Sequence, residues 1–301
     1  MKLSLGSLLP TADRGWKSMY TACGLETCPN TLLMRSVQSR VGISVGQLWY
    51  CSVDCFAEAT RKQLSALAGG SILEMPHQPR LSIGLVMLSK GHLTDGQLRY
   101  AMAQSRLHGE ELEAVLLRLG LATERQLAAA RAAQWGCPVL GQDRIGQPVE
   151  ADIPPTLLHA CSAVPLHCST LAKRFLLGFV YRVEHSLLNS LELVTGYRAE
   201  PCFITPTEYG EQMERITAVA GCEEAVFEDC NTPAEMAKTA AGLAVEVAAR
   251  EARFARCRDY VWTRLTGKRR KIDALFRVKR ASEAGKKKNF PVAEESIRSA
   301  G

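Results

Sequence analysis

The chain has 301 residues, a formal net charge of +6 at pH 7 and 47% apolar residues, a composition that favours packed cores and excludes an intrinsically disordered protein. No stretch reaches the roughly 18 to 20 unbroken apolar residues of a membrane-spanning helix, and residues 1–10 lack the apolar run of an export signal. The odd number of cysteines, 11, therefore indicates reduced thiols or metal ligands rather than a disulfide framework. We expect a cytoplasmic protein of two or three small domains.

Two close pairs of cysteines lie in the first predicted module, residues 15–68. Four residues separate Cys23 from Cys28, and three separate Cys51 from Cys55. Two such pairs can supply four thiolates to one tetrahedral zinc ion. We predict a structural rather than a catalytic Zn²⁺, because four thiolates leave no open coordination position. Ordinary buried or free thiols are the alternative interpretation.

The residues around the second cysteine pair predict a strand followed by a helix. Residues 41–50 alternate between apolar and polar side chains, as in a strand, and a helical pattern runs from Asp54 to Leu67. A strand that leads through Tyr50-Cys51-Ser52 into a helix resembles the treble-clef and FCS-like zinc fingers. That resemblance implies a structural zinc knuckle at the start of the chain.

An internal duplication with a period of 29 residues lies within residues 80–136. Each copy contains a glycine suited to the left-handed position after a helix, then a threonine and glutamine that form a capping box, then an apolar helix face. Two helical hairpins are predicted. The aligned positions are Gly91 and Gly120, Thr94 and Thr123, Gln97 and Gln126, and Leu98 and Leu127.

The two copies form blocks of 24 residues separated by five, and they resemble the N-terminal domain of type II secretion and type IV pilus assembly ATPases. That family's blocks follow the pattern R-L-G-x-x-L-V-x-x-G-x-I-x4-L-x3-L-x2-Q. The matching positions are Ile83, Gly84, Met87, Leu88, Gly91, Leu93, Leu98 and Met102 in the first block, and Leu112, Leu116, Leu117, Gly120, Ala122, Leu127 and Gln134 in the second.

The resemblance extends through an α/β part predicted for residues 150–218, so it covers residues 80–218. Phe175–Tyr181 and Ala199–Ile204 are expected strands, and residues 187–193 and 207–218 are expected helices. The order of these elements is similar to the rest of the family domain, as is the rhythm P-l … v-a … t-G-x-x-v-x-P … i, in which Thr195-Gly196 precedes the second strand.

In that family the domain can bind cyclic di-GMP, which implies a nucleotide site here. The residues that would line it are Gly84, Gly91, Gly120, Gln134, Arg80 and Gln104. Ser82 and Glu111 stand where the family has arginine, Ser105 replaces a glutamine, and Glu113 replaces a glycine. Because guanidinium groups and close backbone approach hold a dinucleotide, and added carboxylates repel its phosphates, we expect weak or absent binding.

The C-terminal segment, residues 232–280, is basic. Residues 232–256 predict one helix, and Tyr260–Leu265 with Ile272–Lys279 predict a basic β-hairpin around Thr266-Gly-Lys268. Residues 250–288 hold 15 lysines and arginines against four acids. Such a segment either keeps one end of the chain in solution or binds anionic lipid, nucleic acid or an acidic protein surface. Residues 281–301 are predicted to be disordered.

The sequence contains no G-x4-G-K-[S/T] phosphate-binding loop and no spacing typical of a catalytic triad or paired carboxylates, so we predict that the chain is not an enzyme. The predicted fold class is multidomain α+β: a zinc-knuckle module, the helical repeat with its α/β part, and a C-terminal helix and hairpin. We expect a non-catalytic regulatory or adaptor protein that binds a pilus, secretion or signalling partner. The alternative is a zinc-containing nucleic-acid-binding regulator that uses the basic hairpin.

Overall fold

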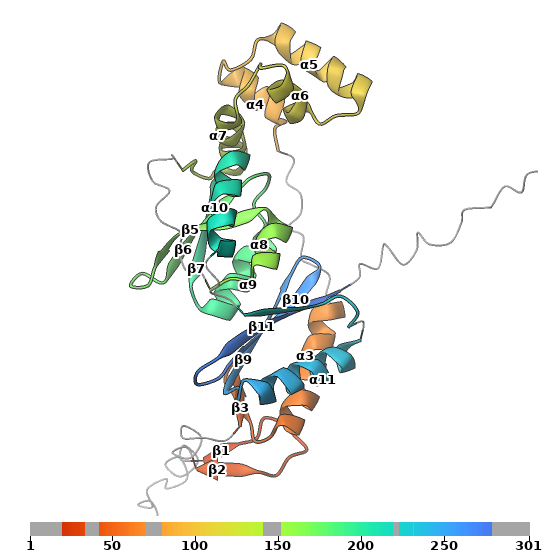
Figure 1. Ribbon diagram of the computed structural model, residues 1–301, viewed down its shortest axis with the longest axis vertical. Helices are drawn as coiled ribbons and strands as arrows, with labels where there is room; N and C mark the ends of the chain where they lie inside the picture. Colours follow the sequence, from red (N-terminus) through yellow and green to blue (C-terminus); the bar gives the residue numbers. More distant parts are fainter. Residues whose placement is uncertain are drawn as a thin grey trace, which may run out of the picture.

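The computed structural model describes residues 20–33, 42–69, 80–140, 152–218, 223–230 and 232–278 (Figure 1). The predicted tail at 281–301, the first residues of the cysteine module and residues 150 and 151 lie outside the described residues. Within the described residues no helix is both long enough and apolar enough to cross a membrane.

A mixed six-stranded sheet joins the cysteine module to the C-terminal segment. Its strand order is β4-β3-β9-β10-β11-β8, and β3 runs parallel to β9, so segments some 200 residues apart share one sheet. Its strands are β3 (Ile43–Val45), β4 (Leu48–Tyr50), β8 (Glu224–Phe227), β9 (Glu251–Cys257), β10 (Tyr260–Thr266) and β11 (Lys271–Arg277).

Helices α3 (Val53–Gly69) and α11 (Pro233–Glu246) cover one face of this sheet (Figure 1). Phe56 of α3, Met236 of α11 and Phe254 of β9 belong to the same buried apolar cluster. The first and last segments, predicted as two modules, thus share a core. The domain boundaries themselves stay predictions.

The opposite face of the sheet packs on the α/β part. A second sheet of order β5-β6-β7 lies there, and Trp262 and Leu275 of the six-stranded sheet contribute to its core. Because side chains alternate along a strand, their sequence neighbours Val261 and Ala274 belong instead to the cluster that holds Phe56 of α3. The elements of this part are α8 (Pro155–Cys161), β5 (Ala163–Ser169), β6 (Arg174–Phe179), α9 (His185–Thr195), β7 (Arg198–Phe203) and α10 (Pro206–Ala218).

The duplicated segment forms two helical hairpins at the end of the molecule far from the cysteines (Figure 1). Both predicted capping boxes are present, with Thr94 and Thr123 as the N-cap residues. Gly91 (φ +70°) and Gly120 (φ +64°) end the preceding helices in the left-handed conformation. The helices are α4 (Ile83–Ser89), α5 (Asp95–His108), α6 (Leu112–Arg118) and α7 (Glu124–Trp135).

Two predictions of local structure are wrong. The helix expected over 232–256 ends at Glu246, and residues 251–257 form β9. Ala248, with φ +47°, turns the chain out of the helix, and pairing with β3 and β10 holds the strand. The single strand expected over 41–50 is the β3–β4 hairpin, which turns at Gly46 (φ +58°). The basic hairpin is confirmed as β10 and β11.

Candidate metal centre and helical-repeat site

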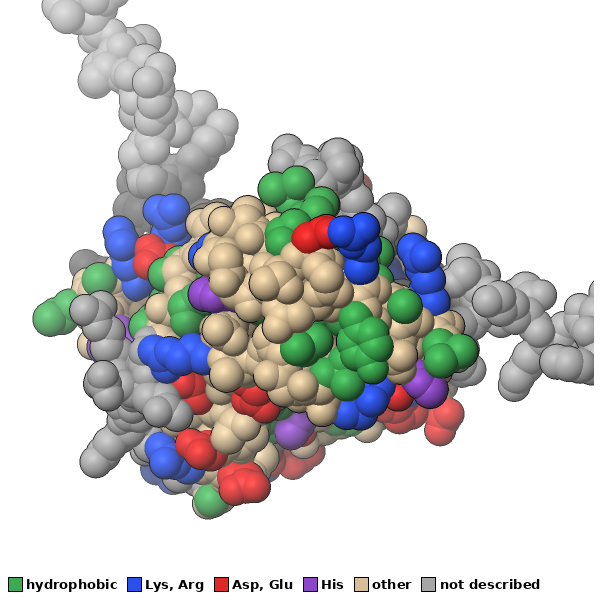
Figure 2. Space-filling model, turned by 90° about the horizontal axis from the view of Figure 1, so that it is seen from above, with side chains coloured by type: hydrophobic (Ala, Val, Ile, Leu, Met, Phe, Trp, Pro, Cys, Tyr) green, Lys and Arg blue, Asp and Glu red, His purple; other side chains and the backbone are tan. Residues whose placement is uncertain are grey.

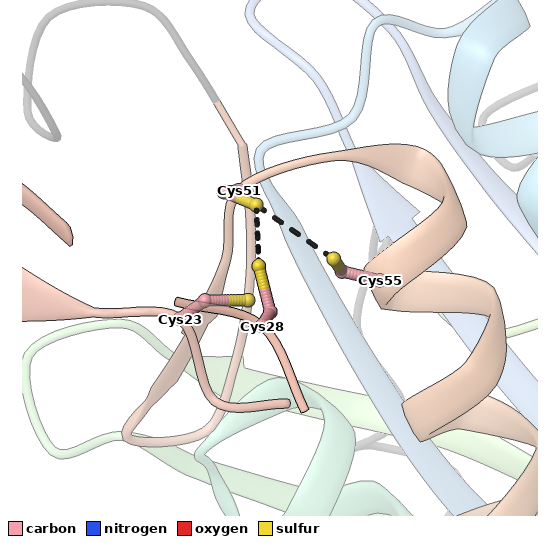
Figure 3. A group of neighbouring side chains, drawn as sticks. All are labelled: Cys23, Cys28, Cys51 and Cys55. Atoms are coloured by element: carbon pink, nitrogen blue, oxygen red, sulfur yellow. Dashed lines mark hydrogen bonds between the residues drawn. The ribbon is translucent and has the colours of Figure 1, made fainter. Parts of the chain in front are cut away.

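Two loops carry the four cysteines to one place (Figure 3). Strands β1 (Tyr20–Ala22) and β2 (Thr31–Leu33) are antiparallel, and the loop between them holds Cys23 and Cys28. Cys51 and Cys55 lie between β4 and the first turn of α3. The backbone N–H of Gly24 donates to the carbonyl of Trp49 at 2.7 Å, which ties the first loop to β4.

The separations of the sulfur atoms fit a tetrahedral metal site. All four Sγ atoms lie within 4.8 Å of one another. The Sγ of Cys51 is 3.6 Å from that of Cys28 and 3.7 Å from that of Cys55. Four thiolates at the usual Zn–S length around one Zn²⁺ stand about 3.8 Å apart. The donor set and its spacing therefore suit Zn²⁺, and the ligation itself stays a prediction.

Local contacts bias the protonation of these thiols. Asn30 Nδ2 donates to Cys51 Sγ at 3.4 Å, and this bond, with the neighbouring thiols, lowers the pKa of Cys51 to about 7. A bond from Ser52 favours the Cys55 thiolate, but burial and the other thiols together raise the pKa of Cys55 to about 12. Four negative charges at these separations repel one another, so full ionisation needs a cation among them.

The start of α3 positions the second pair. The Ser52 hydroxyl accepts from the backbone N–H of Cys55 at 3.2 Å, which makes Ser52 an N-cap residue. Cys55 therefore lies in the first turn of the helix, where the partial positive charge of the N-terminus favours a thiolate. The serine between the two cysteines is thus part of the site's geometry.

The glycines of the helical repeat have structural roles. A Cβ on Gly84 would lie 2.7 Å from Leu98 Cδ1 and 3.2 Å from Leu112 Cδ2, so glycine lets α4 pack closely on its neighbours. Gly91 and Gly120 end helices: the next residue's N–H reaches back to the carbonyl of Met87 in one case and of Leu116 in the other, each at 2.9 Å.

The polar residues predicted for nucleotide contact are divided between two helices. The Arg80 guanidinium stacks on the Trp135 ring, 3.1 Å from its centroid, and Gln134 donates to the Leu81 carbonyl, so both lie at the end of α7. Gln104 lies on α5, where its side chain pairs with His108 of the same helix at 3.2 Å. Within the described residues, no hydrogen bond or ion pair joins these two groups.

The substituted positions take part in the fold. Ser82 is the N-cap residue of α4 and Glu111 that of α6. Glu113 forms an ion pair with Arg131, whose side chain is 6% exposed and also donates to the Val180 carbonyl at 2.9 Å. No sequence pattern had assigned a role to Arg131. A charged residue among the apolar positions of α7 was the signal that could have identified it.

No family model matches the sequence. It is 28% identical over 129 residues to the type IV pilus assembly ATPase PilB of Thermus thermophilus, a match that covers 42% of this chain and 14% of that protein. The structure of MshE with cdg aligns with 46% of this chain and 99% of its own, at 20% identity and a TM-score of 0.38. The N-terminal domain of XpsE aligns with 46% of this chain and 98% of its own, at 24% identity and a TM-score of 0.35.

The chain spans 14% of the length of PilB, so the similarity concerns one part of that ATPase. This sequence similarity agrees with the family resemblance of the two 24-residue repeat blocks. About two fifths of this chain is therefore similar in sequence to one part of a type IV pilus assembly ATPase.

Proposed function

We propose that this chain is a non-catalytic adaptor that binds a protein partner in a pilus, secretion or signalling system, and that its four clustered cysteines hold a structural Zn²⁺. The observation that carries the adaptor role is the similarity to a pilus assembly ATPase over only 14% of that protein. The phosphate-binding motif that ATP hydrolysis requires is absent from the sequence.

The nearest approach to such a motif, Thr266-Gly-Lys268, lies in the turn between β10 and β11. The N–H of Gly267 donates to the carbonyl of Arg270 at 2.8 Å, which closes the turn. A phosphate loop instead leads into a helix whose N-terminal amides face the ligand. This geometry supports a structural role for the motif.

Cyclic di-GMP control is the finer part of the proposal. MshE was solved with cdg, and the repeat blocks here resemble that family of domains. In this chain, however, Ser82 caps α4, Glu111 occupies the N-cap position of α6 without a side-chain cap hydrogen bond, and the Glu113 carboxylate is bound to Arg131. We propose a repeat kept for its fold and its protein contacts, with weak or no affinity for the dinucleotide.

The nucleic-acid alternative has less support, because most basic side chains of β9 to β11 bind groups within the fold. Among the exposed basic residues of 250–278, only Lys268 and Arg269 form no hydrogen bond or ion pair within the part of the chain that the structure describes. Side chains of this segment that contact a carboxylate or a carbonyl are those of Arg253, Arg256, Arg258, Arg264, Arg270, Lys271 and Arg277.

Co-purification tests the proposed function. The tagged chain is expressed in its native host. The proteins that elute with it are quantified against a control that expresses the tag alone. We expect enrichment of pilus or secretion components that does not change when the eluate is treated with nuclease. Enrichment of nucleic acid alone, with retention that falls steeply as salt rises, would instead support the nucleic-acid regulator.

A further inference from the structure

The two helical hairpins of the repeat are covered unequally. In the second copy, Arg131 and Ala132 of α7 are buried. Their counterparts 29 residues earlier, Met102 and Ala103 of α5, are exposed. The duplication therefore produces the same helix face twice. On α7 this face is buried, and on α5 it is exposed within the described residues.

The buried face of α7 shows which contacts such a surface can make. Arg131 donates to the carbonyl of Val180, Ala132 belongs to the core of the α/β part, and the Trp135 ring lies 6.4 Å from that of Phe203. By contrast, α5 buries only Leu98 and Ala101, on the side that faces its own hairpin and α6.

Around the exposed side of α5, two arginines lie between apolar side chains, with Met102 on one margin and Leu107 and Tyr100 on the other, Met102 and Tyr100 being about 160° apart around the helix axis. Met102 is 39% exposed, Tyr100 55% and Leu107 74%. Arg99 and Arg106 lie seven residues apart along the same face, about 10 Å by the rise of a helix. Figure 2, which looks onto this end of the molecule, shows apolar side chains gathered beside Lys and Arg.

We propose that this outer face of α5 docks a protein partner whose contact surface is an apolar strip that carries two carboxylates. The proposal rests on the proposed adaptor function and names the surface that performs it. Arg106 has no ion pair within the described residues, and Arg99 pairs only with exposed Asp95 of its own helix, a weak contact that a partner's carboxylate can replace. Exposed apolar side chains around two arginines match the composition of interface centres.

The charges argue against the other occupants. Two α5 helices packed against each other would bring arginine face to arginine face, because Asp95 is the one acidic residue of the helix. A nucleic acid would meet Glu110 and Glu111 just beyond the helix, and it gains little from Met102 or Leu107. A protein surface with carboxylates satisfies both the apolar and the basic parts of the face.

Site-specific photocrosslinking tests the surface in the full-length chain. The photoreactive residue p-benzoylphenylalanine replaces Tyr100 in one variant and Leu193, an exposed apolar residue of α9, in the matched control. We expect crosslinks from position 100, but not 193, to a partner segment in which at least two acidic residues flank apolar ones. Crosslinks to a second copy of this chain, to nucleic acid, or equally from both positions would overturn the proposal.

Binding of the crosslinked partner, purified, then measures the contribution of the two charges. Reversal of both charges, Arg99→Glu with Arg106→Glu, should weaken the affinity by about tenfold or more, and exchange of the partner's two acids for lysine should restore it. The control Arg174→Glu reverses an exposed arginine of β6, 55% exposed, and should leave the affinity unchanged.

The experiments distinguish a wrong docking surface from a wrong adaptor function. If the tagged chain still enriches pilus or secretion components while the α5 variants bind them as tightly as the unmodified chain, only the docking surface is wrong. If no such component is enriched, the adaptor function is wrong. Because all substituted side chains are exposed, unchanged thermal unfolding of each variant shows that folding is not the cause.

Discussion

Arg264 holds the buried carboxylate of Asp273 with two parallel hydrogen bonds. Its Nε and Nη2 each donate to a different carboxylate oxygen at 2.8 Å, and the Asp273 side chain is 1% exposed. Arg264 Nη1 also donates to Asp152 at 3.0 Å, at the edge of the α/β part. One residue pair in the six-stranded sheet therefore ties the sheet to the neighbouring part of the molecule.

Replacement of Asp273 by alanine should destabilise the protein strongly. The substitution removes both hydrogen bonds that the buried guanidinium of Arg264 donates to this carboxylate, and loss of one partner of a buried pair costs about 3 to 5 kcal/mol. Urea unfolding measures the change. The control Glu228→Ala removes the exposed partner of Arg277 and should leave the midpoint almost unmoved. Equal shifts in the two variants would contradict the importance of the buried pair.

Removal of zinc should loosen the C-terminal sheet as well as the cysteine module. Elemental analysis should give about one zinc per chain, bound through Cys23, Cys28, Cys51 and Cys55. Cys51→Ser or a chelator should then speed amide exchange in 42–69 and also in 251–277, because both belong to one core. The repeat at 80–136, which has its own core, should stay protected.

Cys168→Ser is the matched control, because this half-buried cysteine lies on β5, away from the cluster. It should change neither the zinc content nor the exchange in 42–69. If the protein is purified without a chelator and contains no zinc, the metal assignment is wrong. Faster exchange confined to the cysteine module would mean that the shared core does not couple the two segments.

Gly84→Ala and Gly96→Ala should have opposite effects. The two glycines occupy the same position in the first turn of α4 and of α5. A Cβ on Gly84 would press on Leu98 and Leu112, which we expect to destabilise by about 1 kcal/mol or more, whereas nothing lies within 4 Å of a Cβ on Gly96. Alanine at Gly96 should stabilise by up to about 0.5 kcal/mol. Thermal unfolding of both variants measures the two changes in stability. If Gly84→Ala is as stable as the unmodified chain, the helices around Gly84 can move apart to accept the methyl group.

The unmodified chain should bind no cyclic di-GMP at micromolar concentrations in calorimetry. Ser82→Arg with Glu111→Arg should recover part of the affinity, because each charged hydrogen bond to a phosphate contributes on the order of 1.5 to 3 kcal/mol. Adding Glu113→Gly should recover more but lower stability, on the order of 2 kcal/mol, because Arg131 loses its ion-pair partner. Tight binding by the unmodified chain would mean that Arg80, Gln104 or Arg106 replaces the missing groups.

Purified protein should hydrolyse no ATP above a boiled control. The only lysine that follows a Thr-Gly pair, Lys268, is exposed in a β-turn rather than at a helix N-terminus. A Lys268→Ala variant should therefore behave as the unmodified chain does. Turnover that disappears in Lys268→Ala would overturn the non-enzymatic assignment.

Local signals in the sequence were enough to predict the helical repeat. The caps at Thr94 and Thr123 and the glycines at 91 and 120 act within one turn of the chain, so their spacing specifies where helices end and begin. The same holds for the cysteine cluster, because each close pair lies on one turn and only the meeting of two turns had to be inferred.

The tertiary structure alone decided how residues 42–69 meet the C-terminal strands. Residues 251–257 have helix-compatible composition, yet they form β9, because pairing with β3 and β10 and burial on both faces outweigh the local preference. Arg256 of that strand reaches the carbonyls of Leu67 and Ala68 at the end of α3, a contact between residues almost 190 positions apart. The sequence by itself predicted the helices of the repeat and the two close cysteine pairs, whereas the shared sheet depends on contacts that no local pattern records.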